Sequence, residues 1–94
     1  MKFLVMWSLE LRLLSADMMK SVVKVGDYAK KLETDGKLEA RYHLVGRHGG
    51  AWIYHVASNE ELDNLLAQSP VYNFAHYDIY PLADMVPQAS ILQK

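Results

Sequence analysis

The chain opens with an unbroken apolar run and then changes to a helical pattern. Residues 2–9 (KFLVMWSL) are nearly all apolar, and Phe, Val and Trp in so short a run favour a strand buried on both faces. From Met18 onward, apolar residues recur at i, i+4, i+7, i+11 and i+14, which places them in one stripe along a helix. We expect Ser15 to cap this helix, which runs to about Thr34, and Gly36 to lie where it ends.

Two alternating segments follow, joined by a glycine-rich connection. In residues 37–45 the even positions are apolar, so a strand there has an apolar face with Tyr42 and a polar face with Arg41. Residues 46–50 (GRHGG) predict a hairpin connection, and residues 51–57 alternate again as a second strand.

The last third of the chain predicts one more helix and one more strand. Ser58 and Glu61 form a capping box (S-x-x-E) ahead of an apolar run, so a helix should begin there and end before Pro70. Residues 76–82 alternate as a final strand. The order strand, helix, strand, strand, helix, strand (βαββαβ) is that of the ferredoxin-like fold, an α+β architecture with an antiparallel sheet and both helices on one face.

The first strand poses the question of what covers the second face of this sheet. A strand with only one covered face alternates with polar residues, and residues 2–9 do not. A second copy of the chain, packed sheet to sheet, is the favoured cover and predicts a homodimer or larger homo-oligomer. The alternative cover is the chain end. We assign residues 1–82 to a single domain and residues 83–94 to a C-terminal arm or tail.

Composition excludes several classes of protein. The 94 residues carry a net charge of −1, which argues against a nucleic-acid binder because such proteins present a basic face. No cysteine is present, so disulfides, thiolate metal sites and a cysteine nucleophile are excluded. The chain has neither a signal-peptide pattern nor a run of about 18 apolar residues, so we expect a cytoplasmic protein with no membrane partner.

A set of features recurs in an order and spacing typical of one family. The features are Gly36-Lys37, Gly46, Ser58-Asn59-Glu60-Glu61-Leu62, Leu65-Leu66, Pro70 and Asp78-Ile79. Together they resemble the muconolactone isomerase family over residues 1–82. The resemblance implies a dimeric α+β barrel, often assembled into larger rings. It also implies an enzyme that shifts a double bond in a lactone by moving a proton between carbons, with no metal or organic cofactor.

The resemblance further implies a proton-carrying carboxylate on the inner face of the first helix, and that position falls on Val25 here. Valine cannot move a proton, so histidine becomes the natural base, because imidazole gives and takes protons near neutral pH. The catalytic candidates are His55 in the middle of a strand and His76, which precedes Asp78 by two residues. Tyr54 is a third candidate, because a phenol can donate a hydrogen bond to a carbonyl.

The remaining candidates are expected to bind a small-molecule substrate. Aromatic side chains are expected to line a space between sheet and helices, and Gly26, on the apolar side of the first helix, leaves room there for a ligand or for a bulky strand residue. His48 lies in the glycine-rich connection, where two placements are open: exposure to solvent, or a position over the mouth of such a space. The candidates for substrate binding are Trp7, Val25, Gly26, Tyr42, His48 and Trp52.

Three functions stay open at this point. The first is a cofactor-free isomerase acting on a small lactone or carbonyl compound. The second is a cofactor-free monooxygenase acting on a phenol, and the third is a non-catalytic binding or assembly protein. No metal site is predicted: His43 and His55 would be diagonal neighbours if the hairpin paired residues whose numbers sum to about 96, but two ligands without a third are not enough.

Overall fold

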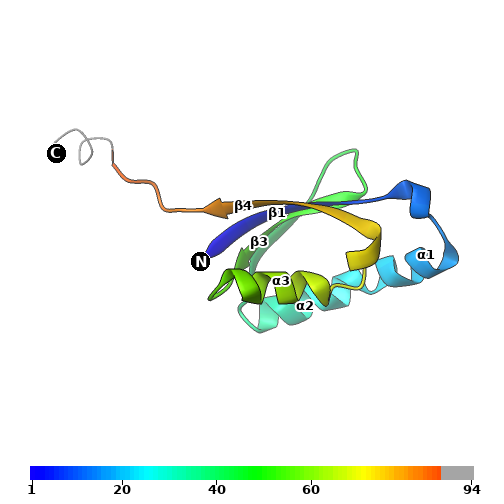
Figure 1. Ribbon diagram of the computed structural model, residues 1–94, viewed down its shortest axis with the longest axis horizontal. Coiled ribbons are helices and arrows are strands. Elements are labelled where there is room, and N and C mark those ends of the chain that lie inside the picture. The colour runs from blue at the N-terminus through cyan, green and yellow to red at the C-terminus, as the bar shows by residue number, and fades with distance from the viewer. Residues whose placement is uncertain (88–94) are drawn as a thin grey trace.

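The protein is a four-stranded antiparallel sheet with its helices on one side. The structure is a computed structural model and describes residues 1–87. The strands are β1 (Lys2–Leu9), β2 (Leu38–His43), β3 (Gly49–His55) and β4 (Ala75–Leu82), in the spatial order β2-β3-β1-β4. The helices are α1 (Ala16–Val23), α2 (Val25–Thr34) and α3 (Asn59–Ala67), with 3₁₀ turns at Leu11–Leu13 and Tyr72–Phe74. Figure 1 shows the helices along one face of the sheet, so the predicted ferredoxin-like α+β fold is confirmed.

The predicted first helix is in fact two helices. Its cap is as predicted, because the side-chain oxygen of Ser15 accepts the N–H of Met18 at 3.1 Å, and the helical segment ends at Thr34. The segment is interrupted at Lys24, whose N–H donates to carbonyls of the preceding turn. Residues 22–26 (VVKVG) surround the break, and β-branched residues and glycine are weak helix formers.

The third helix begins at the predicted capping box. The side-chain oxygen of Ser58 accepts the N–H of Glu61 at 3.1 Å, and the Glu61 carboxylate accepts the N–H of Ala57 at 2.9 Å. Lys37, which immediately precedes β2, donates to the same carboxylate at 3.2 Å. The hydrogen bond from Ala57 and the bond from Lys37 lower the pKa of Glu61, and together these contacts join the start of α3 to the sheet.

A β-bulge in β2 reverses the faces predicted for that strand. Leu38 is buried against the helices, but the register shifts between Leu38 and Ala40, so that Arg41 lies opposite Trp52. Cross-strand partners share a face, so Arg41 points to the helix side and Tyr42 to the other side. The sequence predicted the opposite arrangement. It was wrong because one extra residue in a strand moves every later side chain to the other face.

The hairpin register also differs from the prediction. His43 lies opposite Gly50 rather than near Ile53, because the turn is centred closer to Gly46 than to His48, and the N–H of Leu44 donates to the carbonyl of Gly49. His43 and His55 are therefore not diagonal neighbours. Among residues 1–87 there is no group of three or more His, Asp or Glu side chains able to hold a metal ion.

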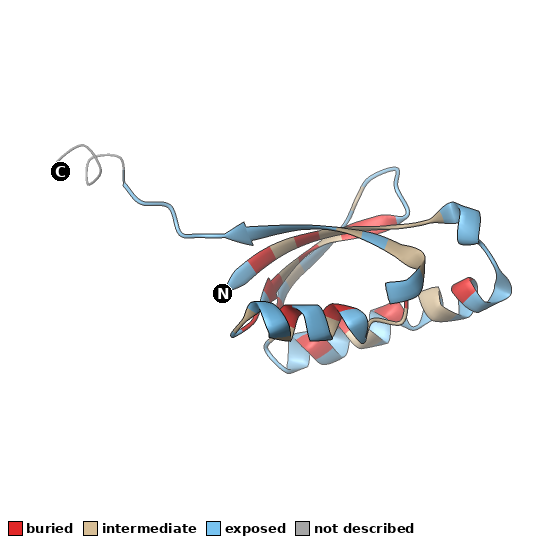
Figure 2. Ribbon diagram, in the orientation of Figure 1, coloured by how far each residue is buried: buried red, intermediate tan, exposed pale blue. Residues whose placement is uncertain are grey.

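The core lies between the sheet and the helices, as the buried segments in Figure 2 show. It joins the inward side chains of three strands to one stripe of α2 and one of α3, which agrees with the predicted helical periodicity. The buried residues of this core are Phe3, Val5, Val25, Ala29, Leu32, Leu38, Trp52, Tyr54, Val56, Leu62, Leu66 and Val71.

The other face of the sheet has an apolar centre bordered by polar residues such as His55 and Asp78, and it has no helix over it within residues 1–87. Leu4 lies at its centre, between Ile53 of β3 and Tyr80 of β4, and Met6 lies further along β1. We call this surface the open face. Residues 83–87 are exposed and extend beyond the end of β4, so this part of the arm does not cover it (Figure 1). The remainder of the arm, residues 88–94, lies outside the described residues. None of the helices in the described part is long and apolar enough to cross a bilayer.

Two glycine substitutions should change stability in opposite directions. Gly26 is exposed and has nothing within 4 Å of an added Cβ, so Gly26→Ala should raise the free energy of unfolding by roughly 0.5–1 kcal/mol. A Cβ at Gly49 would lie 1.9 Å from the backbone oxygen of Trp7, so Gly49→Ala should lower it by about 3 kcal/mol or more. Urea denaturation of both variants tests this, and equal effects would contradict it.

Candidate functional site

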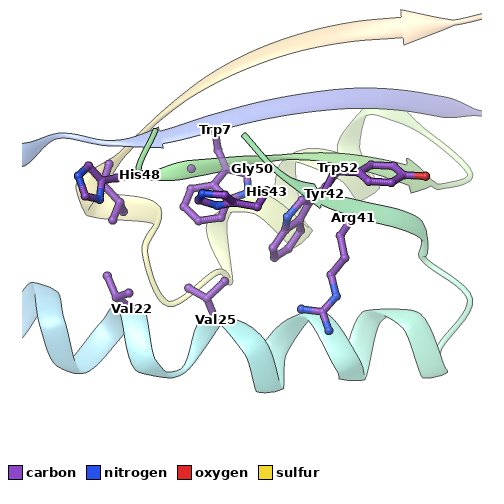
Figure 3. Close-up of a pocket in the computed structure, with 11 residues that line it drawn as sticks. Trp7, Val22, Val25, Arg41, Tyr42, His43, His48, Gly50 and Trp52 are labelled. Atoms are coloured by element: carbon purple, nitrogen blue, oxygen red, sulfur yellow. The ribbon is translucent and has the colours of Figure 1, made fainter. Parts of the chain in front are cut away.

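A cavity of about 440 Å³ lies between the sheet and the junction of α1 and α2. Its volume falls in the range of about 300–1,000 Å³ that is usual for small-molecule sites. In Figure 3, Val22 and Val25 point from the helices toward the sheet, and Trp7 and Trp52 lie on the sheet side. The β2–β3 hairpin forms the remaining wall.

The two tryptophans form an aromatic wall. The ring of Trp7 meets that of Trp52 edge to face, with centroids 5.7 Å apart and planes at 87°. Two valines face them from the end of α1 and the start of α2. Indole faces opposite aliphatic side chains suit a flat, largely apolar ligand.

Gly50 makes this arrangement of the indoles possible. A Cβ at this position would lie 2.8 Å from Nε1 of Trp52 and 2.9 Å from Nε1 of Trp7. The two indole edges therefore occupy the space that a side chain at position 50 would fill. Gly50 was not among the predicted site residues, although Gly-Gly at the end of a hairpin loop, with a tryptophan two residues later, is a signal for close approach.

The hairpin gives the cavity a basic edge. Arg41 and His43 come from β2, and His48 comes from the loop that follows it. No aspartate or glutamate is among the cavity-lining residues in the described chain. The arrangement can therefore bind an anionic or carbonyl oxygen, and two imidazoles are available to accept or donate a proton.

Several residues nominated from the sequence line this cavity. They are Trp7, Val25, Tyr42, His48 and Trp52. Tyr42 contributes to the wall from β2, but its side chain is 65 % exposed and shares the open face with Ala51 across the strand pair. Arg41, His43 and Val22 also line the cavity and were missed, the first two because the bulge was not foreseen.

Tyr54 lies beneath the cavity rather than in it. It is buried beside a void of about 10 Å³ that Trp7, Val25 and Trp52 also border, so these three residues separate it from the larger space. Burial raises the pKa of Tyr54 well above its ordinary value of 10, and the nearby Tyr28 and Tyr77 add to the shift. Its phenol therefore stays protonated at neutral pH and is not a base.

The structure does not bring the other three nominated residues to the cavity. His55 is exposed at the end of β3 and lies opposite Lys2, on the open face. His76 is exposed in β4, where its Nε2 lies 2.9 Å from Oε2 of Glu10 and not beside Asp78. The prediction that Gly26 faces the sheet is wrong, because open solvent lies where its Cβ would be.

Comparison with known proteins identifies relatives of this chain. The muconolactone delta-isomerase family matches residues 1–86. A muconolactone Delta-isomerase of Cupriavidus pinatubonensis is 34% identical over 56 residues, which cover 60% of this chain and 61% of that protein, less than two thirds of its length. The enzyme of the same name from Acinetobacter baylyi is 31% identical over 67 residues, covering 71% of this chain and 68% of that protein.

Two solved structures share the fold. A muconolactone isomerase superposes with a TM-score of 0.79 at 20% identity, over 90% of this chain and 91% of that chain. A 5-chloro-2-hydroxyhydroquinone dehydrochlorinase from Burkholderia phenoliruptrix, in complex with 2,5-dihydroxybenzoquinone, superposes with a TM-score of 0.65 at 12% identity. This second match covers 88% of this chain and 94% of the other. At these identities the likeness shows a common architecture and no more.

The ion pairs around Glu10 should make stability depend on pH. Hydrogen bonds from Arg12 and then His76 lower the pKa of Glu10 from 4.5 to about 2. A carboxylate with a lowered pKa stabilises the fold above its unfolded pKa, and this contribution is lost as the pH falls from about 4.5 to about 2. The difference in unfolding free energy between wild type and Glu10→Gln should therefore shrink between pH 6 and pH 2.5 in urea titrations.

The matched control for that experiment is Asp63→Asn. Asp63 is exposed on α3 and forms no ion pair within residues 1–87. Its replacement should leave the pH dependence of stability close to that of the wild type. A Glu10→Gln profile that runs parallel to the wild-type profile would contradict the role of the Glu10 contacts.

Proposed function

This chain belongs to the muconolactone delta-isomerase family, and from that premise we propose that it moves a proton between two carbons of a small unsaturated lactone or related carbonyl compound. The proposed reaction uses neither a metal nor an organic cofactor. The relatives named above are muconolactone isomerases, which makes muconolactone the first compound to test.

The observation that carries this proposal is that His43 and His48 line the same cavity as Val25. The family resemblance puts a proton-carrying carboxylate at the position of Val25, and valine has no proton to move. Two imidazoles on the opposite wall supply a replacement in the same space. His48 is our candidate for the base, with His43 as its neighbour on the hairpin.

The chemistry needs a base, a stabilised intermediate and a return path for the proton. The imidazole removes a proton from the saturated ring carbon next to the double bond that is conjugated with the carbonyl, and the electron pair moves through that double bond onto the carbonyl oxygen to give a dienolate. His43, on the same basic edge, donates a ring N–H to that oxygen and stabilises the negative charge. The imidazolium then returns the proton to a different carbon, so that the double bond has moved and no atom is gained or lost.

A second candidate function is the cofactor-free oxidation of a phenol by dioxygen, a monooxygenase reaction, at the same basic edge. The indole wall formed by Trp7 and Trp52 favours it, because a flat phenol or quinone stacks on such a surface. The structurally similar dehydrochlorinase was solved with a quinone. A non-catalytic binding protein is the third candidate. This function is supported if the protein turns over neither a lactone nor a phenol.

We further propose that two copies associate through the open face, in the cytoplasm. Leu4, Met6 and Ile53 form an apolar strip across the centre of the sheet. Packing a second sheet on it would remove this apolar surface from water, which favours association. A larger assembly built from such dimers is compatible with the exposed arm at residues 83–87.

Activity of cavity variants tests the isomerase proposal. Wild type should convert muconolactone, and His48→Ala should lower kcat about 10²- to 10⁴-fold, because general-base catalysis contributes that much. His55→Ala and His76→Ala should retain near wild-type kcat, since both residues lie away from the cavity. Steady-state assays of the folded variants measure this.

The Val25→Glu variant distinguishes a chain that has lost the isomerase reaction from a chain that performs it with a base other than a carboxylate. If wild type is inactive on muconolactone and Val25→Glu is active, the natural chain is not a muconolactone isomerase and the second and third functions gain support. Loss of activity in His55→Ala alone would move the base to the open face and contradict the proposal.

Light scattering tests the dimer. Leu4→Lys places a charge at the centre of the open face and should convert a dimer into a folded monomer at micromolar concentration. Val23→Lys is the matched control, because Val23 is 78% exposed on α1 and lies on the helix side of the sheet. A monomeric wild type, or equal effects of the two variants, would overturn the prediction.

A further inference from the structure

Arg41 is placed in the cavity wall by the bulge in β2. After the register shift it lies opposite Trp52 and its guanidinium reaches toward α2 (Figure 3). There its Nε lies 3.2 Å from Oε1 of Glu33. Among the cavity-lining residues of the described chain, Arg41 is the only one with a permanently charged side chain.

The contact with Glu33 leaves Arg41 suited to bind another anion. The side chains of Arg41 and Glu33 are 34% and 41% exposed, and ion pairs this open to solvent add little to stability. A second carboxylate can therefore displace Glu33 from Arg41 at little cost in free energy. The recorded contact involves Nε, whereas a guanidinium presents five N–H donors in a planar fork that matches a carboxylate.

The rest of the cavity fits a ligand with one charged end. His43 and His48 lie with Arg41 along the hairpin, and Glu33, which contacts Arg41 from α2, is not among the residues that line the space. Indole rings and valines form the other walls. A flat ring would lie against the apolar walls while a carboxylate on that ring faces the hairpin.

We propose that Arg41 is the residue that recognises a carboxylate on the substrate, and that Glu33 holds its guanidinium in place until that carboxylate displaces it. The inference rests on the proposed function for the idea of a small ring substrate. It adds a specificity-determining residue, the side chain that selects such a ring by its carboxylate.

Fluorescence titration with a charged and a neutral probe tests the proposal. The chain has two tryptophans, Trp7 and Trp52, and both line the cavity, so quenching of their emission reports occupancy. Wild type should bind benzoate more tightly than benzamide, which has the same ring and no charge. Arg41→Gln should weaken the affinity for benzoate about 10- to 100-fold and leave the affinity for benzamide unchanged, as expected for the loss of a charge-assisted bidentate contact.

Three further variants separate recognition from structure. Arg47→Gln is the matched control, because Arg47 is exposed in the same hairpin loop and does not line the cavity. It should keep the preference for benzoate. Arg41→Lys should restore part of that preference, and Glu33→Gln should strengthen benzoate binding by removing the internal competitor. If the Arg41–Glu33 pair were purely structural, Arg41→Gln and Glu33→Gln would each weaken the binding of both benzoate and benzamide.

The outcomes distinguish this inference from the proposed function. Absence of benzoate binding to wild type at millimolar concentration, or an unchanged preference in Arg41→Gln, would overturn the role of Arg41 even if muconolactone is turned over. If muconolactone is not turned over but Arg41→Gln loses its preference for benzoate, the recognition role stands and the isomerase proposal fails. With active enzyme, Arg41→Gln should raise KM far more than it lowers kcat.

Discussion

The close approach of β1 and β3 at Gly49 and Gly50 is the constraint on which both the sheet and the cavity depend. At Gly49 the backbone of Trp7 fills the place of a side chain, and at Gly50 the indole edges of Trp7 and Trp52 do so. The strands therefore remain paired to the end of the hairpin only because two successive residues lack a Cβ. The same absence lets the indoles meet edge to face and build the aromatic wall.

The two faces of the sheet carry different kinds of residues. The helix side carries the core and, where α1 meets α2, the cavity with its basic edge. The open face carries an apolar strip and the exposed His55. Histidines that look equivalent in the sequence thus belong to different surfaces. His43 and His48 face a ligand-sized space, while His76 is held by Glu10 near the end of β1.

Most of the fold follows from periodicity and capping, and the errors have identifiable physical causes. The helical stripe, the Ser15 cap and the Ser58 capping box depend on local hydrogen bonds and burial, so sequence spacing predicts them well. The bulge in β2 leaves no such trace, because the apolar alternation continues through Ala40 and Tyr42 while the backbone changes phase. Arg41 and His43 were therefore assigned to the wrong face, and two of the three residues of the basic edge were missed. Trp7, Val25, His48 and Trp52 were found because aromatic content and family spacing do not depend on that register.

The break in the helical segment at Lys24 falls between Val22 and Val25, the two valines that face the tryptophans. One wall of the cavity is therefore shared by two short helices that meet at a single residue, while the opposite wall is fixed by sheet hydrogen bonds. A change in the angle between α1 and α2 alters the width of the cavity without disturbing a strand. The size of the ring that such a cavity admits can thus change through substitutions around one helical turn, without altering the hairpin that carries the basic edge.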